Sequence, residues 1–265
     1  MADMAKIKEV RERTGVGFGD CKKALEKADW DIEKALDVLR KESAVKAAKK
    51  ADRTASEGRL AVLISEDCNI WAIAEINTET DFAARNERFV QFCDRVIEVA
   101  IEQGDATIPL LEDEKNELIS AIGENISIRR VARIQSENGV VAGYLHSNAA
   151  VGAIVELSKD VAEINKNVAM HITSENPLVV SADEIPENVL ARETEVYKAQ
   201  ALEMGKPEHI VEGIVKGKLR KFQSESCLDQ QAYIWDRDQT VGALLAKEDA
   251  KCERFVRYQV GESLE

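Results

Sequence analysis

The chain has 265 residues, 32% of them charged, and a net charge of −13. This acidity disfavours nonspecific attraction to a phosphate backbone, so we expect no direct binding of nucleic acid. The five cysteines are scattered without a C-x-x-C pair, and the sequence has neither a long apolar run nor a signal peptide, which together argue against a disulfide framework, a zinc site or a membrane contact and predict a cytoplasmic protein.

Residues 4–41 predict a small unit of three helices, because apolar side chains recur there at helical spacing. A loop with glycine at positions 15, 17 and 19 separates the first two helices and leaves Val16 and Phe18 with little room to be covered. Two interpretations of Phe18 stay open: it packs into the small core, or it is exposed and docks on a partner. Residues 41–53 predict a helical linker whose lysines lie in solvent.

The middle of the chain contains an internal repeat. Residues 60–76 alternate at strand spacing around a turn-rich segment, 65–69, which predicts a β-hairpin. An amphipathic helix follows, and its apolar stripe includes Phe89. The same order returns 81 residues later, where residues 152–157 correspond to 71–76. Two hairpin-plus-helix units with antiparallel sheets predict an α+β core of two pseudo-repeated subdomains.

The segment between the first hairpin and its helix, residues 77–86, is the strongest candidate for a contact site. Phe82 lies one heptad before Phe89, so one interpretation is that it extends the buried stripe. The residues three and four positions after it are Arg85 and Asn86, however, and these do not suit a core. The alternative is that Phe82 is exposed and contacts a partner.

The acidic residues of the same segment allow a structural and a catalytic interpretation. Thr78 followed by Asp81 fits a capping box, which would give the aspartate a purely structural role. Glu79 and Asp81 could instead act as the paired carboxylates of a hydrolase, which predicts turnover by the isolated protein. The three histidines are too dispersed for a ligand set or a triad, and the chain lacks phosphate-binding and nucleophile motifs.

The C-terminal third predicts a projecting element and a return to the core. Residues 186–222 form two amphipathic helices separated by Gly205-Lys206-Pro207, which is the pattern of an αα-hairpin with a narrow apolar seam. A short helix at 241–245 and a closing strand at 255–260 follow. The hairpin is thus an insertion in the second subdomain.

Three separated motifs stand out once the elements are in place. They are Thr14-Gly15-Val16-Gly17-Phe18 with Asp20-Cys21-Lys22-Lys23-Ala24-Leu25, then Thr80-Asp81-Phe82-Ala83-Ala84, then Gly123-Glu124-Asn125-Ile126 with Arg129-Arg130. In this order, and over essentially the whole chain, they resemble the signatures of the translation elongation factor Ts family. The duplicated core and the inserted hairpin make the resemblance more specific than any single motif.

The resemblance implies a non-enzymatic, cofactor-free nucleotide exchange factor that binds the GTPase elongation factor Tu, disturbs its magnesium and phosphate site and promotes GDP release. It implies a UBA-like module with its linker over 1–53, a core N-subdomain over 54–139, the first part of a core C-subdomain over 140–182, a dimerisation-type hairpin over 183–228, and a C-terminal module with the closing strand over 229–265. A 2:2 complex through the hairpin is compatible with it.

The resemblance also implies where the partner is contacted. The residues are Thr80, Asp81, Phe82 and Ala83 at the magnesium site of the GTPase, Val16, Gly17 and Phe18 in the N-terminal loop, and His146, Val241, Leu244 and Leu245 as further contacts. One different class of protein stays open beside the hydrolase: an adaptor that binds ubiquitin-like proteins through residues 4–41 alone, for which the core would be dispensable.

Overall fold

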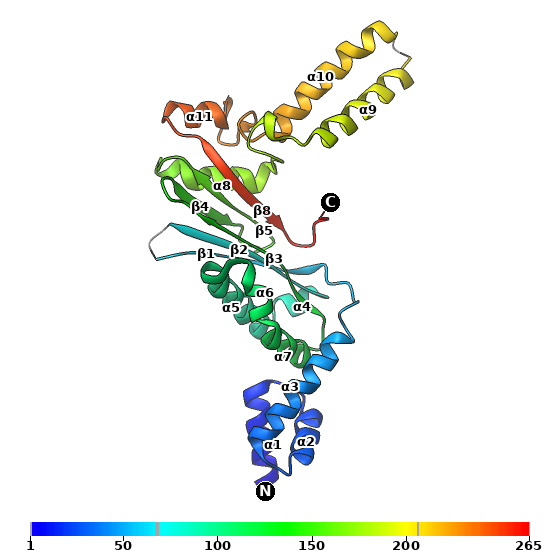
Figure 1. Ribbon diagram of the computed structural model, residues 1–265, viewed down its shortest axis with the longest axis vertical. Helices are drawn as coiled ribbons and strands as arrows, with labels where there is room; N and C mark the ends of the chain where they lie inside the picture. Colours follow the sequence, from blue (N-terminus) through cyan, green and yellow to red (C-terminus); the bar gives the residue numbers. More distant parts are fainter. Residues whose placement is uncertain (1, 67–68, 206, 265) are drawn as a thin grey trace.

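A computed structural model of the protein describes residues 2–66, 69–205 and 207–264. The molecule is elongated, with the N-terminal helices at one end, two small sheets in the middle and a pair of long helices projecting from the other end (Figure 1). The combination of helices with antiparallel sheets confirms the predicted α+β class. Among the described residues, no helix is long and apolar enough to cross a membrane.

The N-terminal unit consists of α1 (Ala2–Thr14), α2 (Phe18–Lys27) and α3 (Ile32–Ala48). Its core is formed by Ile7, Val10, Val16, Cys21, Ala24, Leu25, Ala28, Ala35 and Leu39. The expectation that the glycine-rich loop leaves Val16 uncovered is wrong, since this side chain is only 2% exposed. The reason is local: Gly15 has a φ of 74°, which reverses the chain after α1, and the thiol of Cys21 donates to the Val16 carbonyl.

The expected solvated linker is also corrected by the structure. Helix α3 continues without a break to Ala48 and packs against α7 (Glu112–Ile122). Ser43 and Ala47 are buried along this contact, and Ala47 belongs to the core of the first sheet. Small side chains let the two helix backbones approach closely, although they carry little of the apolar signal that marks a core in a sequence. One helix is therefore shared by the N-terminal unit and the core.

The first sheet has the order β1-β2-β3 and is antiparallel throughout. Its strands are β1 (Glu57–Ile64), β2 (Ile70–Thr78) and β3 (Ile126–Gln135), and the first two form the predicted hairpin. Between β2 and β3 the chain makes α4 (Asp81–Ala84), α5 (Glu87–Gln103), a 3-10 turn (Gly104–Ala106), α6 (Thr107–Leu110) and α7. Helix α5 covers one face of the sheet (Figure 1), and Phe89, Phe92 and Val96 are buried against Ala72, Ala74 and Ile76.

The second sheet has the order β4-β5-β8 and repeats the arrangement of the first. Its strands are β4 (Val140–Leu145), β5 (Val151–Leu157) and β8 (Cys252–Gln259), which is the predicted closing strand. Helix α8 (Glu163–Glu175) lies on it, with Val168 and Ile172 fully buried. The free faces of the two sheets meet in a shared core that includes Ile73 from β2 and Ile154 from β5. The layers are thus helix, sheet, sheet, helix.

The projecting pair is α9 (Glu187–Glu203) and α10 (Glu208–Ser226), joined to the second sheet through a short 3-10 turn (Ala182–Glu184). Its seam is as narrow as predicted: Ala201, Val211 and Val215 are buried, and Tyr197, Ile214 and Leu219 pack against them. The apolar side chains of Met204 and Ile210 are exposed. A small two-stranded ribbon, β6 (Ala232–Tyr233) and β7 (Asp236–Thr240), and the helix α11 (Val241–Lys247) lead back to β8. The division into five domains stays a prediction.

Candidate partner-binding site

The segment between β2 and α5 forms an exposed tip, which we define as Thr80–Ala83. Helix α4 is a single turn there, and Phe82 stands on it with 82% of its surface exposed. Ala83 and Ala84 of the same turn are buried at 5% and 6%, so they anchor the turn on the core. The interpretation that Phe82 extends the buried stripe is therefore wrong: the stripe begins at Phe89, and the ring of Phe82 faces solvent.

The carboxylate of Glu124 holds the tip in place through three hydrogen bonds. Glu124, in the turn before β3, accepts hydrogen bonds from the Thr78 hydroxyl at 3.1 Å, the Thr80 backbone amide at 3.0 Å and the Thr80 hydroxyl at 2.8 Å. The Thr80 hydroxyl in turn accepts from the Ala83 amide at 3.2 Å and so caps α4. The capping residue of α4 is thus Thr80 and not the expected Thr78. The hydroxyl of Thr78 donates to Glu124 instead.

A second acidic side chain closes the same turn. Glu79 Oε1 accepts from the backbone amide of Asn125 at 2.6 Å and lies 3.4 Å from Arg53 Nη1. The side-chain amide of Asn125 donates to the Ala51 and Arg53 carbonyls at 3.3 and 2.8 Å. The Asn125 amide and the nearby Arg53 lower the pKa of Glu79. Glu79 is therefore kept ionised and engaged in structure, which does not suit the proton transfer required by the hydrolase interpretation.

Asp81 is the charged residue of the tip that stays accessible. Its side chain is 48% exposed and makes a surface ion pair with Arg85 at 3.3 Å, one helical turn further on. An exposed pair of this kind is weak, because both charges remain hydrated. Asp81 is therefore free to exchange Arg85 for a group on a partner, and with Phe82 it forms the outer surface of the tip.

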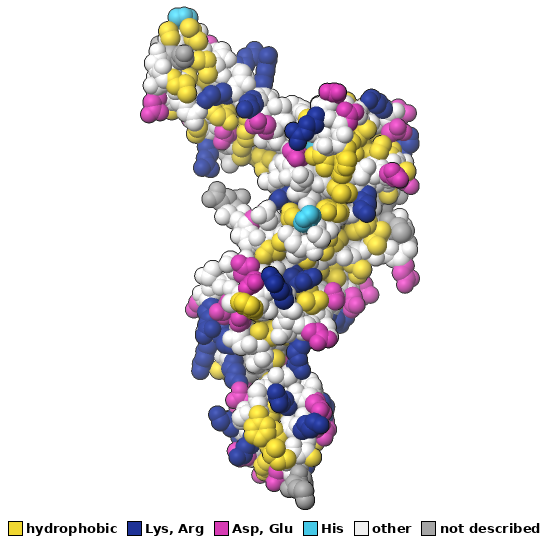
Figure 2. Space-filling view, turned by 180° about the vertical axis from the view of Figure 1, so that it is seen from behind, with side chains coloured by type: hydrophobic (Ala, Val, Ile, Leu, Met, Phe, Trp, Pro, Cys, Tyr) yellow, Lys and Arg dark blue, Asp and Glu magenta, His cyan; other side chains and the backbone are white. Residues whose placement is uncertain are grey.

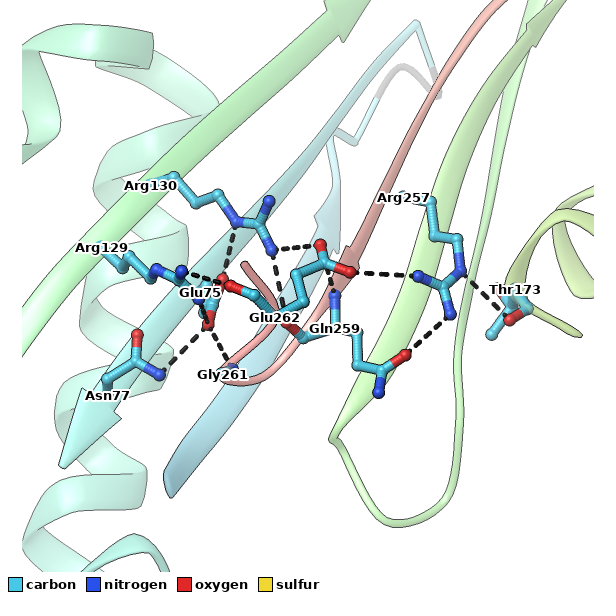
Figure 3. A network of polar contacts seen from close by, with 9 residues as sticks. All are labelled: Glu75, Asn77, Arg129, Arg130, Thr173, Arg257, Gln259, Gly261 and Glu262. Atoms are coloured by element: carbon cyan, nitrogen blue, oxygen red, sulfur yellow. Dashed lines mark hydrogen bonds and ion pairs between the residues drawn. The ribbon is translucent and has the colours of Figure 1, made fainter. Parts of the chain in front are cut away.

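Strand β2, which leads into the tip, is fixed by a buried ion-pair network between the two sheets (Figure 3). Glu75 is fully buried and lies 2.9 Å from Arg129 Nη1 and 2.6 Å from Arg130 Nε. The backbone amide of Gly261, beyond β8, donates to Glu75 at 2.9 Å, and Glu262 pairs with Arg130 at 2.5 Å. Burial acts to raise the pKa of Glu75, but its hydrogen bonds from Gly261, Arg129 and Asn77 and the charge of Arg130 outweigh this and lower it.

The N-terminal loop presents a second exposed aromatic ring. Phe18 is the first residue of α2 and is 45% exposed, so the interpretation that it packs into the small core is wrong. Gly17 precedes it as the capping residue and is exposed, whereas Val16 lies in the core beneath. Of the three residues predicted here, Gly17 and Phe18 form a surface and Val16 supports it.

The remaining predicted contacts lie on the second sheet and beyond it, away from the tip. His146 is exposed in the turn between β4 and β5, with its Nδ1 3.1 Å from the Tyr144 hydroxyl. On α11, Val241 and Leu245 are buried at 0% and 3%, and Leu244 is half-buried. The structure therefore does not gather the predicted residues into one pocket but spreads them along the elongated molecule (Figure 1).

The face of the molecule drawn in Figure 2 does not carry charges of one sign only. In the space-filling view, acidic, basic and apolar side chains alternate over the visible face from the N-terminal unit to the projecting hairpin (Figure 2). No group of three or more His, Cys, Asp or Glu residues among the described positions is arranged to hold a metal ion. What the molecule offers instead is exposed aromatic side chains on firmly held turns.

The sequence alone did not predict that Glu124 and Asn125 support the tip. Glu124 and Asn125 were recognised as part of a motif, but their bonds reach Thr80 and Glu79 across 44 and 46 positions of the chain. The only local signal is their place in a turn after Gly123, whose φ of 92° ends α7. A contact between two turns so far apart is set by the sheet register and not by local sequence.

The fold and the site together describe an α+β scaffold that exposes Phe82 and Phe18 on hydrogen-bonded or capped turns. Comparison with known proteins identifies the family. A sequence model of the family described as Elongation factor TS matches residues 79–262. Relatives named Elongation factor Ts from Teredinibacter turnerae and Hahella chejuensis are each 44% identical over 98% of this chain, covering 90% and 92% of the relatives. One from Clostridium botulinum is 40% identical over the whole chain and covers 95% of the relative.

The chain therefore belongs to the elongation factor Ts family, as the motifs predicted. Membership implies a nucleotide exchange role in the elongation phase of protein synthesis and not a catalytic enzyme.

Proposed function

We propose that this protein binds the GTPase elongation factor Tu in the cytoplasm, disturbs its magnesium and phosphate site and thereby releases GDP so that GTP can bind. The observation that supports this most directly is the exposed ring of Phe82 beside the accessible carboxylate of Asp81. An aromatic ring that is 82% exposed gains little from its own protein and much from a pocket on a partner.

The rigidity of the tip supports the same proposal. Glu124 and the Thr80 cap hold α4 before any partner arrives, so little conformational entropy remains to be lost on binding. Burial of the Phe82 ring would contribute about 1.5 to 3 kcal/mol to the complex. Asp81 would act by its charge near the magnesium ion, because the cation is the largest local charge in a nucleotide site.

Exchange by such a protein needs no catalytic side chain. A factor that binds the nucleotide-free GTPase more tightly than the GDP-bound form weakens GDP binding by the same factor, since coupling between two ligands is reciprocal. Each 1.4 kcal/mol of coupling corresponds to about a tenfold change in GDP affinity. The exposed surface of the N-terminal loop, His146 and the half-buried Leu244 would add affinity without adding chemistry, whereas Val241 and Leu245 are buried and would only support Leu244.

The wider arrangement is part of the proposal. We assign residues 1–53 to the UBA-like module with its linker, 54–139 and 140–182 to the two core subdomains, and 183–228 to the dimerisation-type hairpin, through which a 2:2 complex would form. Residues 229–265 are assigned to the C-terminal module with the closing strand of the second subdomain. The adaptor interpretation is disfavoured because α3 packs on α7, so the N-terminal unit is attached to the core and does not stand alone. No observation favours the hydrolase interpretation.

The test is release of a fluorescent GDP analogue from purified elongation factor Tu during a chase with unlabelled GDP. A substoichiometric amount of this protein should accelerate complete release, because each molecule leaves and acts again. An unrelated small GTPase should show no acceleration. Unchanged release at saturating protein, with the protein shown to be folded, would reject the proposed function.

A further inference from the structure

The first turn of α5 contacts the N-terminal loop directly. Arg88 lies six positions after Phe82, and its Nη1 donates to the backbone carbonyl of Thr14 at 2.9 Å. Thr14 is the last residue of α1. The last carbonyls of a helix have no partner within the helix and carry the negative end of its dipole. A positively charged guanidinium, which can only donate, is therefore a well-suited partner for them.

The contact requires a residue without a side chain at position 15, which Gly15 provides. A β-carbon built on Gly15 would lie 1.4 Å from Arg88 Nη1 and 2.0 Å from its Cζ, so the guanidinium occupies the space that any side chain at position 15 would need. Gly15 also has a φ of 74°, which is costly for other residues. The loop that carries Phe18 therefore has no side chain at position 15, and the guanidinium of Arg88 occupies that space.

The N-terminal unit is also attached to the core on the side of α3. There α3 packs against α7, and Lys50 Nζ donates to the Gly123 carbonyl at 2.5 Å. An open cavity of about 400 Å³ lies at this junction, with Thr14 of α1, Arg88 and Arg95 of α5 and Leu118 of α7 in its lining. Arg88 spans the cavity from α5 to the end of α1.

We propose that Arg88 is a positioning residue that clamps the N-terminal loop to the base of the tip, so that Phe18 and Phe82 are presented to one partner at a fixed spacing. The clamp itself is a property of the free protein, and its purpose rests on the proposed exchange function. If only a fraction of the molecules has the N-terminal loop held by Arg88, the apparent affinity for the partner is reduced to that same fraction of its full value.

The first experiment needs no partner. Spin labels are placed through an unnatural amino acid at Lys8 on α1 and Glu102 on α5, both exposed, and the distance distribution is measured by pulsed resonance. Arg88→Met should broaden or shift this distribution. Arg95→Met is the matched control, because Arg95 lies on the same helix and lines the same cavity, and it should leave the distribution unchanged. An unchanged distribution in Arg88→Met would overturn the clamp.

The second experiment is a double-mutant cycle on binding to nucleotide-free elongation factor Tu. Arg88→Met alone should weaken affinity about three- to tenfold, which corresponds to about 0.7 to 1.4 kcal/mol. In a Phe18→Ala background the same change should have less than about a twofold effect, because the ring that Arg88 positions is gone. Additive losses in the cycle would show that Arg88 does not act through the loop and would overturn the proposal.

The two experiments separate the two proposals. If the wild-type protein releases no GDP, the proposed function fails while the distances still decide whether Arg88 clamps the loop. If the wild type is active and the distances are unchanged in Arg88→Met, the clamp fails and the proposed function stands. Thermal unfolding of each variant, measured alongside, shows whether a loss of affinity reflects unfolding.

Discussion

Replacing Phe82 and Phe89 by alanine should have opposite effects on stability and activity. Phe89 is 0% exposed, and removal of a fully buried phenylalanine ring typically costs about 3 to 5 kcal/mol. Phe82 is 82% exposed, so in the free protein it buries about a fifth of its surface and its truncation should cost less than about 1 kcal/mol. In the complex the lost burial of about 1.5 to 3 kcal/mol corresponds to about a tenfold to hundredfold loss of affinity.

The assay for this pair combines urea unfolding with stimulated GDP release. Phe82→Ala should unfold close to the wild type and release GDP poorly, whereas Phe89→Ala should unfold much earlier and retain activity in the fraction that is still folded. Asp81→Asn is a companion variant, because it keeps the shape of the side chain and removes its charge. If Phe82→Ala is as unstable as Phe89→Ala, or exchanges nucleotide as well as the wild type, the reasoning about the tip is refuted.

Three further outcomes are expected. Glu124→Gln removes one carboxylate oxygen that accepts at the tip, and should lower stimulated GDP release and cost about 1 to 2 kcal/mol in urea, while Glu137→Gln on an exposed turn should do neither; full activity in the first would count against the support by Glu124. Because the pKa of Glu75 is lowered on folding, its stabilising effect is complete above the ordinary value of 4.5 and is lost as pH falls through the folded pKa. The difference in unfolding free energy between wild type and Glu75→Gln should thus shrink on acidification; a constant difference would contradict the pairing. Shortening the hairpin within 187–226 should spare both the core fold and GDP release, and loss of release from a folded variant would disprove this.

Much of the fold followed from periodicity. The stripe around Phe89 indicated a helix correctly, because one face of that helix is buried and the pattern records the burial. The alternation in residues 60–76 indicated the hairpin correctly, although both faces of its sheet are covered, one by α5 and the other by the second sheet. The repeat indicated the second sheet in the same way. The sequence alone leaves the exposure of Phe82 open. Arg85 and Asn86 are the signal that favours it, because a buried face would not contain these side chains.

The errors share a physical cause. Val16 was expected to be uncovered because glycines flank it, yet the positive φ of Gly15 turns the chain back over the small core. Ala47 was assigned to a solvated linker because alanine and serine give a weak apolar signal, although their small size is what allows α3 to approach α7. Thr78 was named as the cap because the motif fits, but Glu124 engages its hydroxyl from another part of the chain. Each outcome depends on the tertiary environment.

The bond from Gly261 to Glu75 has a consequence for how the protein is made. The two residues are 186 positions apart, so Glu75 emerges from the ribosome long before Gly261, whose amide donates to it. The strand β8 likewise reaches β5 only after the whole hairpin of α9 and α10 has been synthesised. Since domains fold from the N-terminus during synthesis, the N-terminal unit and the first sheet form early, and the sandwich closes last. Until then the face of β2 that carries Glu75 lacks the cover that Gly261 and the second sheet supply.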